Sequence, residues 1–241
     1  MTPNIRLGTW ISTGSPLVTE LAMECGFDWL LLDLEHGCTT QADVLPQLQS
    51  IGRSQTLGII RVGALHPEQV SQLLDWGANG IMLPHVASAD KASSFVQSAY
   101  HPPRGHRGLA KTVRATRFGL RAHSENRPPL LIAQIESAEA VENADSIAAV
   151  PGIDVLFVGP ADLQNDLQHP IHASSAKPKS YDECLVTVSK AASSHGKAAG
   201  ILLRDHAEIP RYRSLGFTFI AVDSDFGILR SAYQRILSSE K

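Results

Sequence analysis

The sequence predicts an α/β fold, a (β/α)8 TIM barrel that forms one domain over residues 1–241, and three observations support it. The chain of 241 residues has the usual length of one barrel, and 43% of its residues are hydrophobic, enough for a large core. A pattern repeats at 26–33, 77–84, 152–159 and 216–223, where a glycine precedes six residues and then a polar or turn residue. Other apolar runs bring the candidate strands to eight, which implies a closed barrel.

Each repeat combines the end of a helix with the start of a strand. A glycine suits the position just after a helix, and the apolar run that follows suits a strand buried on both faces. The same assignment fits apolar runs at 7–11, 57–62, 130–135 and 198–203. Together the eight runs predict parallel strands that alternate with helices.

The intervening segments carry signals of helix starts. Proline follows Ser15 and His66, which predicts a proline at the first position of two helices. Ser180 with Glu183, and Asp205 with Glu208, have the spacing of a capping box. Two stretches break the rhythm, at 100–129 and 164–180, and we expect them to be active-site or interface loops.

Charge and cysteine content exclude several classes of function. The formal net charge of −3 is spread along the chain, which argues against nucleic acid and anionic membranes as partners. The three cysteines are far apart and odd in number, which disfavours a disulfide framework and a structural zinc site. We find no secretion signal and no apolar segment of membrane-spanning length. We therefore expect a soluble cytoplasmic protein that acts on small molecules.

Polar residues gather where the predicted strands end. The reacting groups of such barrels lie at the carboxyl ends of the strands. The polar residues that follow the apolar runs are Asp33, Glu35, His36, Arg61, His85, Gln134, Glu136, Asp162 and Asp223. The opposite ends carry mostly glycine and small residues. This asymmetry predicts an active site at the carboxyl ends.

Glu136 and Asp162 form a candidate metal site, because they follow adjacent predicted strands. Two carboxylates without a nearby histidine or thiol favour Mg²⁺ or Mn²⁺, with positions open for water and substrate. Alternatively, each carboxylate caps a helix or pairs with a basic neighbour. Gln134 shares a strand face with Glu136 and could donate a hydrogen bond to a ligand carboxylate or an ordered water.

Asp33, His36 and Arg61 are candidate catalytic residues. Asp33 is close enough in sequence to orient the His36 imidazole as a general base, although a histidine after a strand can also be structural. The planar guanidinium of Arg61 could bind a carboxylate or stabilise an enolate oxygen. The alternative for Arg61 is a salt bridge to Asp33 or Glu35.

Several other mechanisms lack their motifs. No lysine falls on the carboxyl half of a predicted strand, which argues against a Schiff-base mechanism and favours a metal that polarises a carbonyl. The sequence has no G-x-G-x-x-G after a strand, no P-loop and no G-x-S-x-G elbow. The arginines within 104–127 suggest either capture of dicarboxylates or a solvated or subunit-facing loop, in which Arg107 is structural.

Motifs along nearly the whole chain resemble the HpcH/HpaI-type class II pyruvate aldolases, typified by 4-hydroxy-2-oxoheptanedioate aldolase. The matching segments are GTW at 8–10, GFDWLLLDLEHG at 26–37, RV at 61–62, LPHV at 83–86, PPRGHRG at 102–108, AQIE at 133–136 and VPGIDVLFVGPADL at 150–163. The resemblance implies a barrel whose C-terminal helix is exchanged between subunits of a homo-hexamer.

The resemblance also implies roles for individual residues. Glu136 and Asp162 would be the metal ligands, for Mg²⁺ or Mn²⁺, with Co²⁺ and Zn²⁺ as further candidates. His36, oriented by Asp33, would be the base, and Arg61 would steady an enolate oxygen. The pyruvyl carboxylate would be held by Gln134 and by the backbone at Gly159, Pro160 and Ala161.

The predicted activity is reversible cleavage of a 4-hydroxy-2-oxo acid into pyruvate, or hydroxypyruvate, and an aldehyde. One alternative is a related barrel lyase or decarboxylase that acts on oxaloacetate or a malyl-type substrate. Another is a non-catalytic protein that binds a metal and a carboxylate. The segments after His36 and after Asp162 depart from the family pattern, so the family's usual aldehyde is not assumed.

Overall fold

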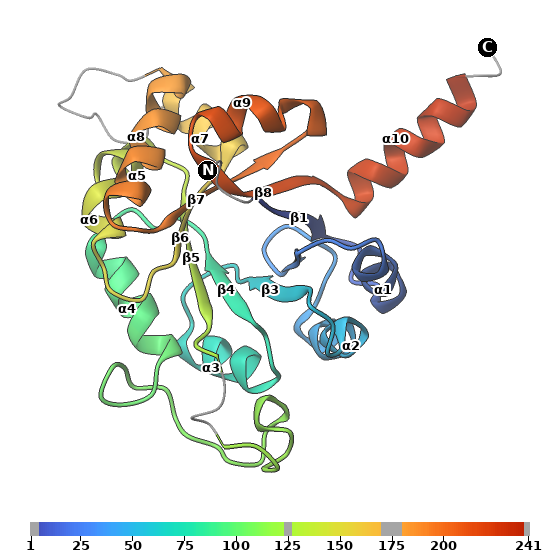
Figure 1. Cartoon of the computed structure of the whole chain (residues 1–241), viewed down its shortest axis with the longest axis vertical. Coiled ribbons are helices and arrows are strands. Elements are labelled where there is room, and N and C mark those ends of the chain that lie inside the picture. The colour runs from blue at the N-terminus through green and yellow to red at the C-terminus, as the bar shows by residue number, and fades with distance from the viewer. Residues whose placement is uncertain (1–4, 123–126, 170–179, 239–241) are drawn as a thin grey trace.

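The computed structural model confirms the predicted (β/α)8 barrel. It describes residues 5–122, 127–169 and 180–238. Eight strands pair in parallel in sequence order, and β8 pairs with β1 to close the barrel (Figure 1). The strands are β1 (Arg6–Ile11), β2 (Trp29–Asp33), β3 (Leu57–Arg61), β4 (Gly80–Leu83), β5 (Leu130–Ile135), β6 (Val155–Val158), β7 (Ala198–Leu203) and β8 (Phe217–Ser224).

Helices fill the connections between the strands. They are α1 (Pro16–Glu24), α2 (Gln41–Ile51), α3 (Pro67–Asp75), α4 (Ala89–Ala99), α5 (Ala138–Glu142), α6 (Ala144–Ala148), α7 (Pro160–Gln168), α8 (Tyr181–Ser194), α9 (Ile209–Ser214) and α10 (Asp225–Ser238). Prolines begin α1 and α3 as predicted, and Ser180 forms the predicted capping box of α8. The predicted loop at 164–180 is wrong in part, because α7 continues to Gln168; residues 170–179 lie outside the described residues.

The predicted helix start at Asp205 differs from a regular capping box. Asp205 caps only a 3-10 turn, η3 (His206–Glu208), by accepting a hydrogen bond from the amide of Ala207. Pro210 has no amide hydrogen and sits in the first turn of α9, where a proline is tolerated. The chain therefore begins α9 after the turn instead of extending one helix from Asp205.

In three of the four repeats, an Asp or Asn follows two residues after the glycine and accepts a backbone hydrogen bond at the amino ends of the strands. All four repeat glycines have positive φ, from 91° at Gly26 to 108° at Gly152, a conformation that favours glycine. Two residues further on, Asp28, Asn79 and Asp154 accept the backbone amides of Leu7, Gly58 and Leu131 at 2.7, 2.8 and 2.8 Å. These three side chains thus satisfy amides at the amino ends of neighbouring strands.

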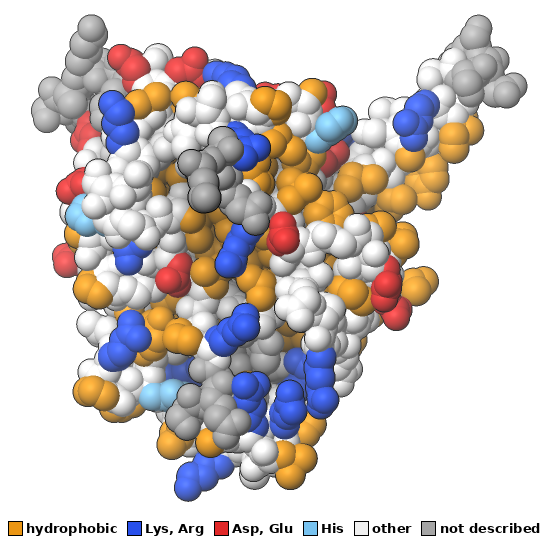
Figure 2. All heavy atoms as spheres, viewed as in Figure 1, with side chains coloured by type: hydrophobic (Ala, Val, Ile, Leu, Met, Phe, Trp, Pro, Cys, Tyr) orange, Lys and Arg blue, Asp and Glu red, His pale blue; other side chains and the backbone are white. Residues whose placement is uncertain are grey.

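Helix α10 is the one labelled helix that extends away from the barrel in Figure 1. Its start is fixed, because the Asp225 carboxylate accepts hydrogen bonds from the amides of Ser12 and Thr13 at 2.9 and 3.0 Å. Hydrophobic side chains lie along the projecting helix and on the surface at its base (Figure 2). No described helix is both long and apolar enough to span a membrane.

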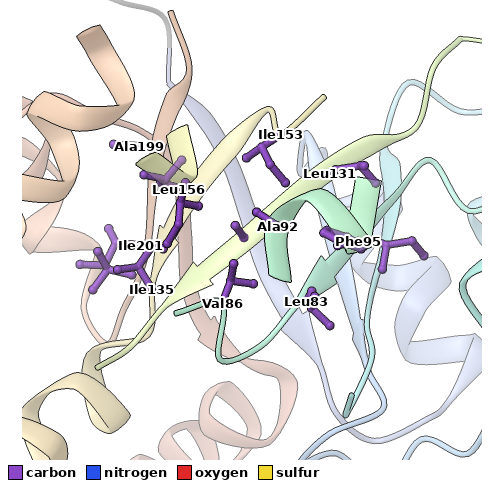
Figure 3. Packing of buried hydrophobic residues seen from close by; sticks show 14 of the residues in the cluster. Leu83, Val86, Ala92, Phe95, Leu131, Ile135, Ile153, Leu156, Ala199 and Ile201 are labelled. Carbon is purple, nitrogen blue, oxygen red and sulfur yellow. The ribbon is translucent and has the colours of Figure 1, made fainter. Parts of the chain in front are cut away.

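The core consists of two groups of buried side chains. The larger group lies between the strands and the helices; Figure 3 shows part of it, with Phe95 of α4 beside Leu131 of β5. The smaller group is rich in aromatic residues: Trp10, Trp29, Phe157 and Phe219, with a stacked pair of Trp29 and Phe219 at 4.3 Å. Because strand side chains alternate between faces, this second group fills the barrel interior.

The arginine-rich segment at 100–129 connects α4 to β5, and therefore lies at the amino ends of the strands. Of the two expectations for this segment, the active-site loop is wrong for this reason, and the interface loop stays a prediction. Arg114 donates hydrogen bonds to the carbonyls of Leu48 and Trp76, near the ends of α2 and α3. Arg107 pairs with Asp75 at 2.5 Å, which supports the structural interpretation of Arg107.

Candidate active site

The inward-facing positions change from apolar to charged as the strands approach their carboxyl ends. Leu31 is followed on the same face by Asp33, Ile59 by Arg61, and Ile132 by Gln134. The aromatic group therefore forms a floor below a set of polar side chains. Asp33, Arg61, Gln134 and Glu136 are all buried at this end of the barrel.

Arg61 is held by two carboxylates. It is in register with Asp33 across β2 and β3, and its Nε and Nη2 donate to the two Asp33 oxygens at 2.9 and 2.7 Å. Its Nη1 lies 3.0 Å from Oε2 of Glu35. The alternative interpretation of Arg61, a salt bridge to Asp33 or Glu35, is therefore confirmed, and Arg61 pairs with both residues.

The environment keeps Arg61 charged and leaves part of it available to a ligand. Burial lowers the pKa of Arg61, but the hydrogen bonds and negative charge of Asp33, with Glu35 and Glu136, raise it above its ordinary value. Among the described residues, these three contacts leave one N–H on each terminal nitrogen without an acceptor. The guanidinium carbon also lies 5.6 Å from the centre of the Trp10 ring, within the range of a cation–π contact.

Asp33 contacts His36 through the backbone. Oδ1 of Asp33 is 3.1 Å from the amide nitrogen of Glu35 and 3.4 Å from that of His36. The His36 ring is exposed, and its Nε2 lies 3.9 Å from Oε2 of Glu35. Asp33 and His36 thus lie close together after β2, but the carboxylate beside the His36 ring is that of Glu35.

Glu136 lies beyond β5 among other acidic groups. Its Oε1 accepts a hydrogen bond from the amide of His85 at 2.6 Å and lies 2.9 Å from Nδ1 of the His85 ring. Burial raises the pKa of Glu136, His85 opposes this, and the negative charges of Asp162 and Glu35 add to the rise, so the pKa is above its ordinary value. Asp162 itself is exposed in the first turn of α7.

Gln134 and Gly159 complete the wall beside Glu136. Oε1 of Gln134 is buried and has no hydrogen-bond partner among the described residues. A Cβ atom at Gly159 would lie 2.5 Å from Oε2 of Glu136 and 2.8 Å from Nε2 of Gln134, so the close approach requires glycine. Pro160 begins α7 and Ala161 is exposed beside Asp162.

This arrangement fits a divalent cation. A buried carboxylate that faces further negative charge gains stability from a nearby cation, and an unpartnered acceptor leaves a position for a ligand donor. In the parts of the chain that are described, no three His, Cys, Asp or Glu side chains converge as metal ligands. A site built on Glu136 and Asp162 would thus have two protein ligands.

Two side chains of this site received no role from the sequence. Glu35 links Arg61 to both His36 and His85, with a distance of 3.7 Å from its Oε1 to Nε2 of His85. For His85, the sequence shows only a polar residue after a strand. Its φ of 54°, which turns the backbone amide and the ring toward the same carboxylate, is not visible in the sequence.

A closed parallel barrel with buried acidic and basic side chains at its carboxyl ends is the arrangement of a barrel enzyme. The family model described as HpcH/HpaI aldolase/citrate lyase matches residues 6–232. The chain belongs to this family, as the sequence motifs predicted.

Individual relatives agree with this assignment. A 5-keto-4-deoxy-D-glucarate aldolase of Escherichia coli is 36% identical over 240 residues, which cover 98% of this chain and 93% of the relative. An HpcH/HpaI aldolase/citrate lyase family protein from Burkholderia cenocepacia has a TM-score of 0.88 and 34% identity, over 99% of this chain and 95% of that one. An HpcH/HpaI aldolase from Desulfitobacterium hafniense also has a TM-score of 0.88, with 29% identity over 99% and 93% of the two chains. The predicted class of enzyme, a carbon–carbon lyase, is confirmed.

Proposed function

We propose that this protein is a divalent-metal-dependent class II aldolase that reversibly cleaves 4-hydroxy-2-oxo acids into pyruvate, or hydroxypyruvate, and an aldehyde. The observation that carries the proposal is the buried Glu136 carboxylate, which faces the charges of Asp162 and Glu35 beside the unpartnered Gln134 oxygen. Family membership supports it, because HpcH/HpaI aldolases generally depend on a divalent metal ion.

The relatives suggest the class of substrate. A 5-keto-4-deoxy-D-glucarate aldolase acts on a dicarboxylate that has a ketone next to one carboxylate and a hydroxyl group two carbons from that ketone. Cleavage breaks the carbon–carbon bond between the methylene and the hydroxyl-bearing carbon. The hydroxyl loses its proton and becomes an aldehyde, and the electron pair passes to the pyruvyl fragment, which takes up a proton at its methylene carbon. We infer a hydroxylated dicarboxylate of this type for this protein.

Glu136 and Asp162 would hold the metal ion, with Mg²⁺ or Mn²⁺ favoured by their oxygen ligands and Co²⁺ or Zn²⁺ as further candidates. When bound, the ion supplies Lewis-acid polarisation of the 2-oxo group. Gly159 keeps the space next to both Glu136 and Gln134 open for the ligand.

The remaining residues would bind the substrate and move its proton. The uncommitted N–H groups of Arg61 would donate to the ketone oxygen as negative charge develops there. Gln134 and the backbone at Gly159, Pro160 and Ala161, where α7 begins, would hold the pyruvyl carboxylate. His36, whose exposed ring lies beside Glu35, would accept the hydroxyl proton during cleavage and return it during synthesis.

We also propose that α10 is exchanged between subunits of a homo-oligomer, as in the predicted hexamer. Leu229, Tyr233 and Leu237 are exposed at helical spacing along α10, with exposed fractions of 39%, 62% and 69%. A groove of about 440 Å³ lies beside the base of the helix, lined on the barrel by Leu7 and Phe27, among others. An exposed apolar stripe next to an apolar groove is suited to a second copy. Light scattering should show an oligomer for the wild type and a smaller species for Tyr233→Asp.

Proton exchange at the methyl group of pyruvate tests the proposed activity. In deuterated buffer with Mn²⁺, the methyl signal in the proton NMR spectrum should decay, and EDTA should stop the decay. The same preparation should release pyruvate from 5-keto-4-deoxy-D-glucarate. A metal-loaded protein that gives neither exchange nor cleavage would contradict the proposal, and release of CO₂ from oxaloacetate alone would indicate the decarboxylase instead.

A further inference from the structure

His85 is held in an uncommon conformation at the edge of the site. It follows β4 and Pro84 and has a φ of 54°, a left-handed conformation that is uncommon for residues other than glycine, although histidine is enriched there. Its carbonyl accepts a hydrogen bond from Nζ of Lys91 at 2.8 Å, and the next amide, of Val86, donates to the carbonyl of Gln134 at 3.1 Å. These contacts fix the backbone on both sides of the strained residue.

This conformation directs two donors to one oxygen atom. The amide nitrogen of His85 lies 2.6 Å from Oε1 of Glu136, and Nδ1 of its ring lies 2.9 Å from the same oxygen. Oε2 of Glu136 instead faces Gly159, since a Cβ atom there would be 2.5 Å away. The two oxygens of Glu136 therefore have different surroundings, one occupied by His85 and the other next to Gly159, which has no side chain.

We propose that His85 is a positioning residue that occupies Oε1 of Glu136 and thereby presents Oε2 alone to the divalent cation. This inference rests on the proposed function, because it takes Glu136 as a metal ligand. The other ring nitrogen, Nε2, lies 3.7 Å from Oε1 of Glu35, so a second carboxylate limits rotation of the ring. Hydrogen bonds to ligating side chains orient them, and their removal commonly weakens metal binding by about 10- to 100-fold.

Two substitutions separate the ring from the backbone. His85→Gly keeps the amide donor and accepts the left-handed conformation without strain, so it removes only the ring. His85→Asn also tolerates this conformation and supplies a short side-chain amide that can donate to Glu136. His195→Asn is the matched control: the His195 ring has the same 2.9 Å distance to a carboxylate, that of Asp145, at the far end of α8.

The test is titration of each metal-free protein with Mn²⁺ alone, with free Mn²⁺ measured by electron paramagnetic resonance. Circular dichroism should show that every variant is folded. We expect His85→Gly to bind Mn²⁺ about 10- to 100-fold more weakly than wild type, His85→Asn to recover most of the affinity, and His195→Asn to match the wild type. Saturating Mn²⁺ should restore a large part of the kcat lost by His85→Gly.

Two outcomes would overturn the inference while leaving the proposed function in place. One is a folded His85→Gly variant with the Mn²⁺ affinity of the wild type, and the other is a His85→Asn variant no tighter than His85→Gly. Failure of the proposed function gives a different result, because the wild type would then bind Mn²⁺ no more tightly than Glu136→Ala.

Discussion

The two ends of the barrel use the same types of polar residue in opposite ways. At the amino ends, Asp28, Asn79 and Asp154 each accept a backbone amide of a neighbouring strand. At the carboxyl ends, Glu136 shares its surroundings with Asp162 and Glu35, and an oxygen of Gln134 has no partner among the described residues. The polar groups at the amino ends hydrogen-bond to the backbone of the fold, whereas the Gln134 oxygen at the carboxyl ends has no partner among the described residues and the proposed ligand would supply one.

The buried Glu136 at the carboxyl ends and the partly buried Asp154 at the amino ends illustrate the difference. Burial raises the pKa of Asp154, but the amide of Leu131 and the charges of Lys197 and Arg104 oppose the rise. Burial also raises the pKa of Glu136, and there two acidic neighbours reinforce the rise against His85. Changes at the carboxyl ends should therefore affect catalysis most, and changes at the amino ends should affect stability.

Glu136→Ala should have the largest effect. Because it removes the buried carboxylate that we propose as a metal ligand, we expect kcat at saturating Mn²⁺ and substrate to fall by about a thousandfold or more. Asp28→Asn, at the other end of the barrel, should keep its kcat and serves as the control. Wild-type turnover in Glu136→Ala would remove the basis for the metal site.

Gly159→Ala should come next. The added Cβ would lie 2.5 Å from Oε2 of Glu136, which must then move, and misplacing a reacting group by about 1 Å can cost about 100-fold in rate. Gly108→Ala is a matched control, because a Cβ there meets nothing within 4 Å. Equal values of kcat/KM for the two variants would show that the space beside Glu136 is not needed.

Glu136→Gln should stabilise the metal-free protein while it impairs catalysis. Because the folded state raises the pKa of Glu136, the ionised carboxylate destabilises the fold at neutral pH. The free energy of unfolding of the wild type should therefore fall as pH rises from the ordinary glutamate pKa through the raised pKa of Glu136. The variant, which has no carboxyl group at this position, should not show this fall. Thermal melts should show a higher Tm for the variant at pH 7, by about 2–4 °C per kcal/mol, and no such gain at low pH. A gain that does not change with pH would contradict the assigned cause.

Asn79→Ala should have the smallest effect and act on stability alone. It removes the acceptor of the Gly58 amide, a hydrogen bond worth about 1 kcal/mol, so Tm should fall by about 2–4 °C. The kcat of the folded enzyme should stay at the wild-type value. A loss of kcat without a loss of Tm would contradict the claim that residues at the amino ends act on stability and not on catalysis.

The sequence predicted the parts of this structure that depend on local pattern. Apolar runs and repeated glycines located the eight strands, and the positions of Asp33 and Arg61 at the ends of two strands brought them to one site. The salt bridge between Arg61 and Asp33 depends on the register of β2 and β3, which places the two residues opposite each other. Because the sequence does not reveal this register, it left two roles open for Arg61, ligand binding and a salt bridge.

Other features depend on backbone geometry that the sequence does not reveal. The φ of His85 directs its ring to Glu136, and the turn after β2 places Glu35 rather than Asp33 beside the His36 ring. The arginine-rich segment breaks the rhythm of the repeats, so the sequence leaves open an active-site loop and an interface loop. Its place between α4 and β5 sets Arg107 and Arg114 at the other end of the barrel.

Anomalous diffraction from crystals soaked with Mn²⁺ and pyruvate would test the central claim most directly. We expect one strong manganese peak between the carboxylates of Glu136 and Asp162, with pyruvate bound against it, near Arg61 and Gln134. A manganese peak elsewhere, or pyruvate bound away from these two carboxylates, would contradict the proposed site.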